Sequence, residues 1–286
     1  MNDALQALIA DSPELASLPE VVMRAVDMIN DPRTSASDIG AVIRQDPALA
    51  MRLLGLVNSS FYGFPSRIET ISRAVTVIGT LELLDLILGA SVIKAFAGLP
   101  STLVNMHKFW SHSLYTGLVT RGLAVRHRAP NPERYFVAGL LHDVGSLVLY
   151  LRRPEQAGQA LALARDEGAV LSDAEQALFG FAHAELGAEL MGNWKLPPAL
   201  TEPVRFHHQP SAAVNYPLES ALVHLADVIA SSVMGCATDS DHVPPLDEAA
   251  WQLTGLSVNV IEPVLADADG EFADVRSALL PEASAA

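Results

Sequence analysis

The sequence contains little cysteine and few basic residues. Its one cysteine, Cys236, has no partner for an internal disulfide, which excludes a disulfide-stapled secreted scaffold. Among 286 residues, 18 are Lys or Arg and 33 are Asp or Glu, so the formal net charge is −15. A surface of this sign repels a phosphate backbone instead of releasing counterions from it. We therefore expect no nucleic-acid partner.

Long uninterrupted apolar runs are also absent. The first residues, MNDALQALIADSPE, have neither the basic region nor the apolar stretch of a signal peptide. The most apolar stretch, 135–151, is interrupted by His142 and Asp143, and the next, 81–96, contains three charged residues. A membrane-spanning helix needs about 20 predominantly apolar residues. We expect a cytoplasmic protein without a membrane partner, in which these stretches are buried core helices.

The pattern that is present is helical. Half of the residues are apolar and 18% are charged, which is typical of a folded chain. No segment alternates polar and apolar residues over the length of a strand, and no Asn-Gly or Asp-Gly pair joins β-branched runs. Helix starts are marked by Ser35 with Asp38, by Asp46-Pro47 and by Asn131-Pro132. The sequence predicts an all-α protein.

Apolar spacing predicts the extent of these helices. They cover 21–29, 39–43, 47–58, 68–78, 81–96, 102–127, 132–151, 153–167, 172–179, 182–193, 197–208 and 216–234. The segment 98–101, Gly-Leu-Pro-Ser, combines a helix stop with a helix start and predicts a boundary between two helical bundles.

A loop at 58–67 contains two Phe and one Tyr. These rings are either tucked over the seam between the two bundles or exposed as a contact surface. Asn58 ends the preceding helix, and Asn at that place is typical of the left-handed conformation.

The last part of the chain is acidic. Residues 239–286 contain ten Asp or Glu and one basic residue, Arg276, so the local net charge is 1 − 10 = −9. The segment is either a solvated, frayed tail or a docking surface for a basic partner.

A His-Asp pair lies in the middle of the most apolar predicted helix. Because 135–150 is apolar on nearly every face, we expect it to be buried on nearly every face. Burying His142 and Asp143 costs free energy unless both find partners. Either a divalent cation binds both residues, or Asp143 forms an ion pair with a neighbouring His or Arg in the core.

Further imidazoles and a carboxylate lie on other apolar helical segments. They are His112, His183, His207, His208 and Asp227. Neutral imidazole is a common metal ligand, and carboxylates bridge hard or borderline cations. The set favours one or two bound cations. His224, three residues before Asp227, is expected to support the site instead of binding a cation.

Several motifs resemble those of one family. They are Ser17-Leu18-Pro19, Gln45-Asp46-Pro47, the stretch 138–145, Gly192-Asn193-Trp194 and His207-His208-Gln209-Pro210. With the series His, His-Asp, His, His-His, Asp, they are similar to the HDOD domain, an output domain of bacterial signalling proteins related to the HD superfamily of metal-dependent phosphohydrolases. The resemblance covers about 14–235 and leaves 236–286 as an acidic C-terminal segment. It implies an N-terminal helical subdomain, 14–99, and an HD-like helical subdomain, 100–235.

The resemblance also implies a dinuclear metal site. Its ligands would be His112, His142, Asp143 and Asp227 for one divalent cation, and His183, His207 and His208 for a second, with Asp143 bridging. Iron or manganese is the expected kind of cation. In an active HD hydrolase, Asp143 would also be the catalytic residue.

The chain departs from the HD-GYP cyclic-dinucleotide phosphodiesterases of the same superfamily. Their Lys after the His-Asp pair is Ser146 here, and the acidic ligand one turn before their first His is Lys108. Their Gly-Tyr-Pro loop has no counterpart in 209–217. We therefore expect a regulatory signal-transduction module that binds a signalling protein partner or a nucleotide ligand. The alternative is a metal-dependent phosphohydrolase acting on a phosphodiester or cyclic nucleotide.

Overall fold

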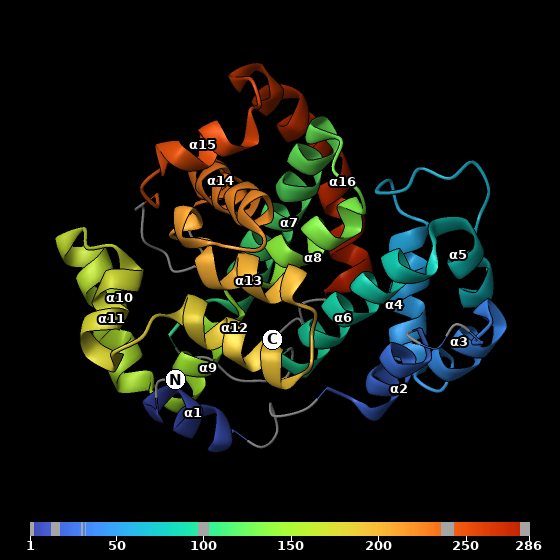
Figure 1. The fold of residues 1–286 in the computed structure, drawn as a ribbon, viewed down its shortest axis with the longest axis horizontal. Helices are drawn as coiled ribbons and strands as arrows, with labels where there is room; N and C mark the ends of the chain where they lie inside the picture. Colours follow the sequence, from blue (N-terminus) through green and yellow to red (C-terminus); the bar gives the residue numbers. More distant parts are fainter. Residues whose placement is uncertain are drawn as a thin grey trace. The chain divides into compact units, whose positions relative to one another are not determined.

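A computed structural model describes residues 3–12, 18–29, 31, 33–96, 103–235 and 243–280. These residues form helices, turns and connecting segments, and none of them is in a strand (Figure 1). The predicted all-α class is confirmed.

The chain divides into two compact units. The larger contains Met1–Ser17 and Leu99–Leu265, and the smaller contains Leu18–Gly98 and Ala266–Ala286. The predicted bundle boundary falls in the stretch 97–102, which lies outside the described residues.

The described residues of the smaller unit form helices of 8 to 19 residues. They are α2 (Glu20–Ile29), α3 (Ala36–Ile43), α4 (Pro47–Val57), α5 (Ile71–Ile78), α6 (Thr80–Phe96) and most of α16 (Ile261–Leu279). The predicted capping box is present: the Asp38 amide donates to Ser35 Oγ, and the Ser35 amide donates to the Asp38 carboxylate. Helix α6 packs against α2, α4 and α5.

The larger unit holds the remaining helices. They are α1 (Asp3–Ala10), α7 (Met106–His127), α8 (Pro132–Leu141), α9 (Val144–Arg152), α10 (Pro154–Glu167), α11 (Leu171–Phe179), α12 (His183–Asn193), α13 (Pro198–Phe206), α14 (Pro217–Met234), α15 (Glu248–Thr254), and two short 3₁₀ helices, η1 (Pro210–Ala212) and η2 (Val258–Val260). The longest, α7, packs against α8 and α14 (Figure 1). Helix α14 is long and apolar enough to cross a membrane by length and composition, but more than half of it is buried inside the protein.

The single helix predicted over 132–151 is interrupted. Helix α8 ends at Leu141, α9 begins at Val144, and His142 and Asp143 form the turn between them. Both flanking helices are buried, so apolar periodicity continues across the break and conceals it. The correction matters because the turn carries the His-Asp pair.

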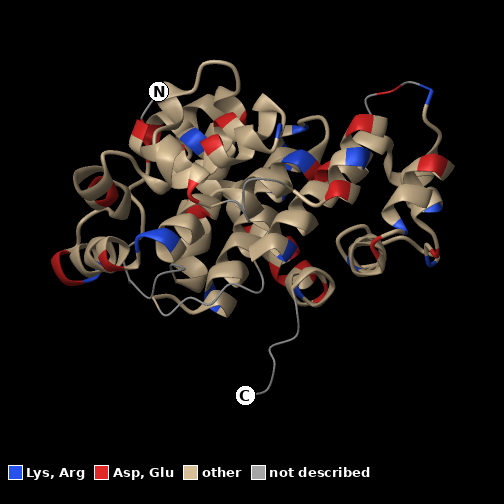
Figure 2. Ribbon diagram, turned by 90° about the horizontal axis from the view of Figure 1, so that it is seen from below, with Lys and Arg blue, Asp and Glu red and all other residues tan. Residues whose placement is uncertain are grey.

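The interpretation of the acidic segment as a frayed tail is wrong for residues 243–280. They form α15, η2 and α16, with Ala250, Val264, Ala268 and Val275 buried. The spacing of the last three is helical, but the surrounding acidic residues obscured it. Figure 2 shows Asp and Glu distributed over the helices, with fewer Lys and Arg between them.

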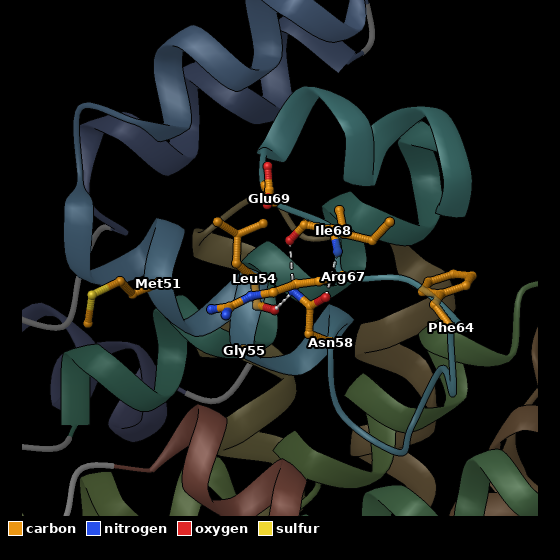
Figure 3. Close-up of a pocket in the computed structure, with 8 residues that line it drawn as sticks. All are labelled: Met51, Leu54, Gly55, Asn58, Phe64, Arg67, Ile68 and Glu69. Carbon is orange, nitrogen blue, oxygen red and sulfur yellow. Dashed lines mark hydrogen bonds between the residues drawn. The ribbon is translucent and has the colours of Figure 1, made fainter.

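Asn58 holds the aromatic loop in place. Its Nδ2 donates to the carbonyls of Leu54 (2.7 Å) and Ile68 (2.8 Å), and the Ile68 amide donates to its Oδ1 (2.7 Å) (Figure 3). Its φ of −94° is not left-handed, so the predicted conformation is wrong. Of the two alternatives, burial holds for Phe61, whereas Phe64 is half-buried and stacks on Tyr62 with ring centroids 5.4 Å apart.

Replacing Asn58 should destabilise the smaller unit. Asn58→Ala removes three hydrogen bonds and leaves the backbone of Ile68 without its partner, so we expect a loss of about 1–3 kcal/mol in the free energy of unfolding, measured by urea denaturation. Asn193→Ala is the control, because Asn193 is exposed and makes no side-chain hydrogen bond within the described part of the chain, and it should stay within about 0.5 kcal/mol. Equal effects of the two substitutions would contradict the role given to Asn58.

Asp46 is the N-cap of α4 and an ion-pair partner of α6. Its Oδ1 accepts from the Leu49 amide (3.1 Å), and its Oδ2 accepts from Lys94 Nζ (2.6 Å). Partial burial raises the pKa of Asp46, but Lys94 and the Leu49 amide outweigh this effect and the net pKa is lowered. The carboxylate therefore adds stability above its unfolded pKa and loses it as pH falls through the lowered pKa.

We expect Asp46→Asn to keep the cap but lose the ion pair with Lys94. At pH 7 the cost should be less than about 1 kcal/mol, since the pair is partly exposed to solvent. The difference from wild type should shrink below about pH 4, as the wild-type carboxylate becomes protonated. Denaturant unfolding between pH 7 and pH 3 checks this. A difference that stays constant over the range, or that persists unchanged in a Lys94→Gln background, would argue against it.

Candidate metal centre

The structure brings together all seven side chains singled out from the sequence. They come from α7 (His112), the turn between α8 and α9 (His142, Asp143), the start of α12 (His183), the turn after α13 (His207, His208) and α14 (Asp227). They form two groups, and within each group the potential ligand atoms lie within 4.8 Å of one another. One group is His112, His142 and Asp227, and the other is Asp143, His183, His207 and His208.

The first group is fully buried. His112 Nε2 lies 3.1 Å from Asp227 Oδ1, and His142 Nε2 lies 3.6 Å from the same oxygen. Ser231 Oγ donates to Asp227 Oδ1 (3.3 Å). Two imidazole nitrogens and a hydroxyl therefore converge on one carboxylate oxygen.

The second group surrounds Asp143. Its Oδ1 lies 3.2 Å from His183 Nε2 and 3.7 Å from His207 Nε2. His208 Nε2 is 2.9 Å from His183 Nε2, so two ring nitrogens face each other. Such a pair is stable only if one nitrogen carries a hydrogen or if a cation lies near both.

Asp143 connects the two groups. Its Oδ1 faces His183 and His207, whereas its Oδ2 lies 3.3 Å from His142 Nε2. This is the position that the bridging ligand of a dinuclear site requires, because each oxygen serves a different group.

The outer nitrogens of two rings, those of His142 and His207, donate hydrogen bonds to backbone carbonyls. Nδ1 of His142 donates to the Gly139 carbonyl (2.7 Å), and Nδ1 of His207 donates to the Val204 carbonyl (2.7 Å). With the hydrogen on Nδ1, a neutral ring presents a lone pair at Nε2. Nε2 of His142 and of His207 are buried and have no hydrogen-bond partner. This tautomer, with an outer acceptor and an inner lone pair, is the one that metal-binding histidines adopt.

When no cation is bound, the imidazoles of the centre differ in pKa: two are raised and two are lowered. Burial lowers the pKa of His142, but Asp143 and Asp227 outweigh it and raise the pKa to about 10. Burial likewise opposes the effect of Glu175 and Asp143 on His183, whose pKa is raised well above its usual value. Protons on these two rings then offset the charges of Asp143 and Asp227, a role that a divalent cation could take over.

The other two imidazoles behave oppositely. Burial and the surrounding imidazoles His208, His142 and His183 hold the pKa of His207 well below its usual value. Burial and the His183 charge lower the pKa of His208 to about 3. Both rings are therefore neutral, the form in which imidazole binds metals.

Sequence reasoning missed Glu175. It lies on α11, is buried, and accepts from both the backbone amide (2.8 Å) and Nδ1 (2.6 Å) of His183. A carboxylate behind a histidine orients the ring and makes it a stronger ligand. No pattern in the sequence singles out this glutamate among the 33 acidic residues.

His224 supports the centre, as the sequence predicted. Its Nδ1 donates to the His207 carbonyl (2.7 Å), and its Nε2 accepts from the Asp247 amide (2.9 Å). Both ring nitrogens are thus used, and neither is available to a cation. The ring links the backbone of a cluster residue to the start of α15.

Gly145 allows the turn that carries Asp143 to approach the helix that carries His183. A Cβ at this position would lie 2.0 Å from the His183 carbonyl oxygen and 2.6 Å from the Gly187 amide nitrogen. The start of α9 therefore touches the backbone of α12, which brings Asp143 to His183.

We expect Gly145→Ala to destabilise the larger unit. The added methyl group meets backbone atoms that cannot move aside easily, so the loss should be about 1–3 kcal/mol or more in urea unfolding. Gly192→Ala is the matched control, because nothing lies within 4 Å of its added Cβ, and alanine in a helix is favoured over glycine by about 0.5–1 kcal/mol. If Gly145→Ala were as stable as the control, the close approach would not be required.

Comparison with known proteins agrees with this architecture. The family model for the HDOD domain matches residues 15–210. An uncharacterised protein of Treponema pallidum (strain Nichols) is 32% identical over 216 residues, which are 74% of this chain. The chain spans about two fifths (41%) of the length of that curated relative.

Two solved structures are similar over nearly their whole length. One is a candidate phosphohydrolase from Shewanella amazonensis SB2B, with 25% identity and a TM-score of 0.76, covering 96% of this chain and 98% of that one. The other is an HDOD domain protein of unknown function from Geobacter sulfurreducens, with 27% identity and a TM-score of 0.72, covering 92% and 91%. On the extent of the family match, the chain belongs to the HDOD domain family.

Proposed function

We propose that this protein is a regulatory signal-transduction module whose larger unit binds one or two divalent cations. It acts by binding a signalling protein partner or a nucleotide ligand. The observation that carries the cation proposal is the pair of buried, unpartnered Nε2 atoms of His142 and His207, on either side of Asp143. A divalent cation would satisfy these lone pairs and the carboxylate oxygens together, in place of the protons that otherwise balance the carboxylates.

The donor set fits a borderline cation. Five imidazoles and two carboxylates suit Fe²⁺, Mn²⁺ or Zn²⁺ better than an all-oxygen site would. Bound cations would neutralise the two carboxylates and supply a Lewis acid. The protein's own part is to hold the ligands: Glu175 fixes His183, and backbone carbonyls fix His142 and His207.

The burial of the centre favours a structural or regulatory role for the cations. The side chains of His142 and His207 are 0% exposed and that of Asp227 is 5% exposed, whereas Asp143 reaches 18%. A cationic side chain beside the centre would also help to bind the phosphate of a substrate. Arg205, the basic residue closest in sequence to His208, donates instead to Glu189 (3.0 Å).

A second candidate function is metal-dependent phosphodiester or nucleotide hydrolysis with Asp143 as the catalytic residue. The complete ligand set favours it, as does the similarity to the candidate phosphohydrolase from Shewanella amazonensis. The departures at Ser146 and in 209–217 speak against it, because they remove the groups that hold the substrate in the HD-GYP enzymes.

The cation proposal is tested by elemental analysis of protein purified without chelator. We expect one or two equivalents of iron, manganese or zinc in the wild type, and less than half of that in Asp143→Ala, because both groups lose a ligand. Asp166→Ala, which removes an exposed carboxylate paired with Arg165, should keep the wild-type content. Circular dichroism shows whether each variant is folded. If the wild type still contains no bound metal after incubation with Fe²⁺, Mn²⁺ and Zn²⁺, the proposal is refuted.

The choice between module and enzyme is tested separately with the metal-loaded protein. Cyclic dinucleotides and a generic phosphodiester are incubated with wild type and Asp143→Ala. Stoichiometric metal without turnover supports the module. Metal-dependent turnover that disappears in Asp143→Ala would establish the hydrolase instead.

A further inference from the structure

The smaller unit contains a cavity that includes none of the seven clustered residues. Its volume is about 810 Å³, within the range of small-molecule sites. The lining residues are Met51, Leu54, Gly55, Asn58, Phe64, Arg67, Ile68 and Glu69 (Figure 3). They come from α4 and from the loop that follows it, so one short stretch of chain builds the whole site.

The walls of the cavity are apolar and held in place. Helix α4 contributes Met51 and Leu54, and the loop contributes Phe64 and Ile68. The Asn58 amide already binds the backbones of Leu54 and Ile68, so it fastens the loop to the helix and is not free for a ligand. Phe64 is held by its stacking on Tyr62, with an interplanar angle of 4°. The cavity is therefore formed in advance of binding, which reduces the entropy that a ligand must overcome.

One cation faces this apolar space. The Arg67 side chain extends from the loop toward α4 in Figure 3, and within the described ranges it has no ion-pair partner. An available guanidinium beside apolar walls favours a carboxylate or sulfonate group. Glu69, also in the lining, cancels the charge of Arg67 overall and disfavours any anionic group that the guanidinium does not hold directly. The charges thus select a ligand with a single anionic group.

Met51 completes the match to an amphipathic ligand. Its side chain is large and apolar, yet 73% exposed. Methionine adapts its shape to apolar groups that bind against it. Exposure of this residue beside Leu54 leaves apolar surface for the body of a ligand whose anionic group pairs with Arg67.

We propose that this cavity binds an apolar monoanion, an aromatic or aliphatic carboxylate or sulfonate. The anionic group pairs with Arg67, and the apolar body contacts Met51, Leu54 and Phe64. This ligand site is separate from the proposed cation centre and goes beyond the proposed function.

The test uses the fluorescent probe 8-anilinonaphthalene-1-sulfonate, an aromatic monoanion, on the full-length protein. We expect saturable binding of one probe per chain, weakened about tenfold by Arg67→Gln, the loss expected of one charge-assisted hydrogen bond. The uncharged analogue N-phenyl-1-naphthylamine should bind Arg67→Gln and wild type equally. Arg73→Gln, an exposed arginine of the same unit outside the lining, is the control and should bind the sulfonate as wild type does.

A second variant tests the apolar wall independently. Met51→Glu places a carboxylate beside the cavity and should abolish binding of the sulfonate probe, whereas Val214→Glu, which changes a residue that is 82% exposed and outside the lining, should not. Both the Met51 and Arg67 variants must retain the wild-type circular dichroism spectrum, since both residues lie on the surface.

Three outcomes would overturn the proposal. The first is sulfonate binding that is unchanged in Arg67→Gln and Met51→Glu. The second is that Arg67→Gln weakens binding of the uncharged analogue as much as binding of the sulfonate. That result would show that the probes adsorb to apolar surface without recognition of the anionic group. The third is displacement of the probe by ATP, because a polyanion should be excluded by Glu69. Binding should persist in Asp143→Ala, which separates this result from that on the cation centre.

Discussion

The larger unit depends on the compensation of buried negative charge. Asp143 and Asp227 lie in a water-poor centre where an ionised carboxylate is stable only beside positive charge or hydrogen-bond donors. Five imidazoles surround them, and two of those rings can carry the balancing protons. The same arrangement accepts divalent cations, because the protons and the cations compete for the same lone pairs. The proposed role of the centre follows from this exchange.

The helices around the centre are arranged to satisfy that constraint. The break between α8 and α9 places His142 and Asp143 in a turn, where their side chains face both groups at once. Close backbone contact at Gly145 joins this turn to α12. Glu175 and His224 then hold His183 and the His207 backbone from outside. Such preorganisation suits a cation with a structural role and a cation with a catalytic role equally well. The burial of the centre favours the structural role.

In the smaller unit, buried backbone groups are stabilised by hydrogen bonds to a single side chain. A buried amide, that of Ile68, and two carbonyls need partners where the loop after α4 leaves the helical pattern. Asn58 supplies all of them, and the loop so held forms one wall of a cavity with an available arginine. Asn58, which the sequence marks only as the end of a helix, is thus the residue that shapes a candidate ligand site. The two units therefore offer distinct chemistry, imidazoles and carboxylates in one and apolar walls with a guanidinium in the other.

Local sequence determined most of the helices. Apolar periodicity and caps such as Ser35 and Asp46 act within a few residues, so their effect could be predicted directly. Residue type and an apolar setting also identified the seven clustered side chains, since such groups are buried only when they meet partners. Tertiary structure alone decided the turn at His142, the contact of Glu175 with His183 and the packing of the apolar residues of α16. Each of these depends on contacts between residues distant in the chain, and such contacts leave little trace in the local pattern of apolar and polar residues.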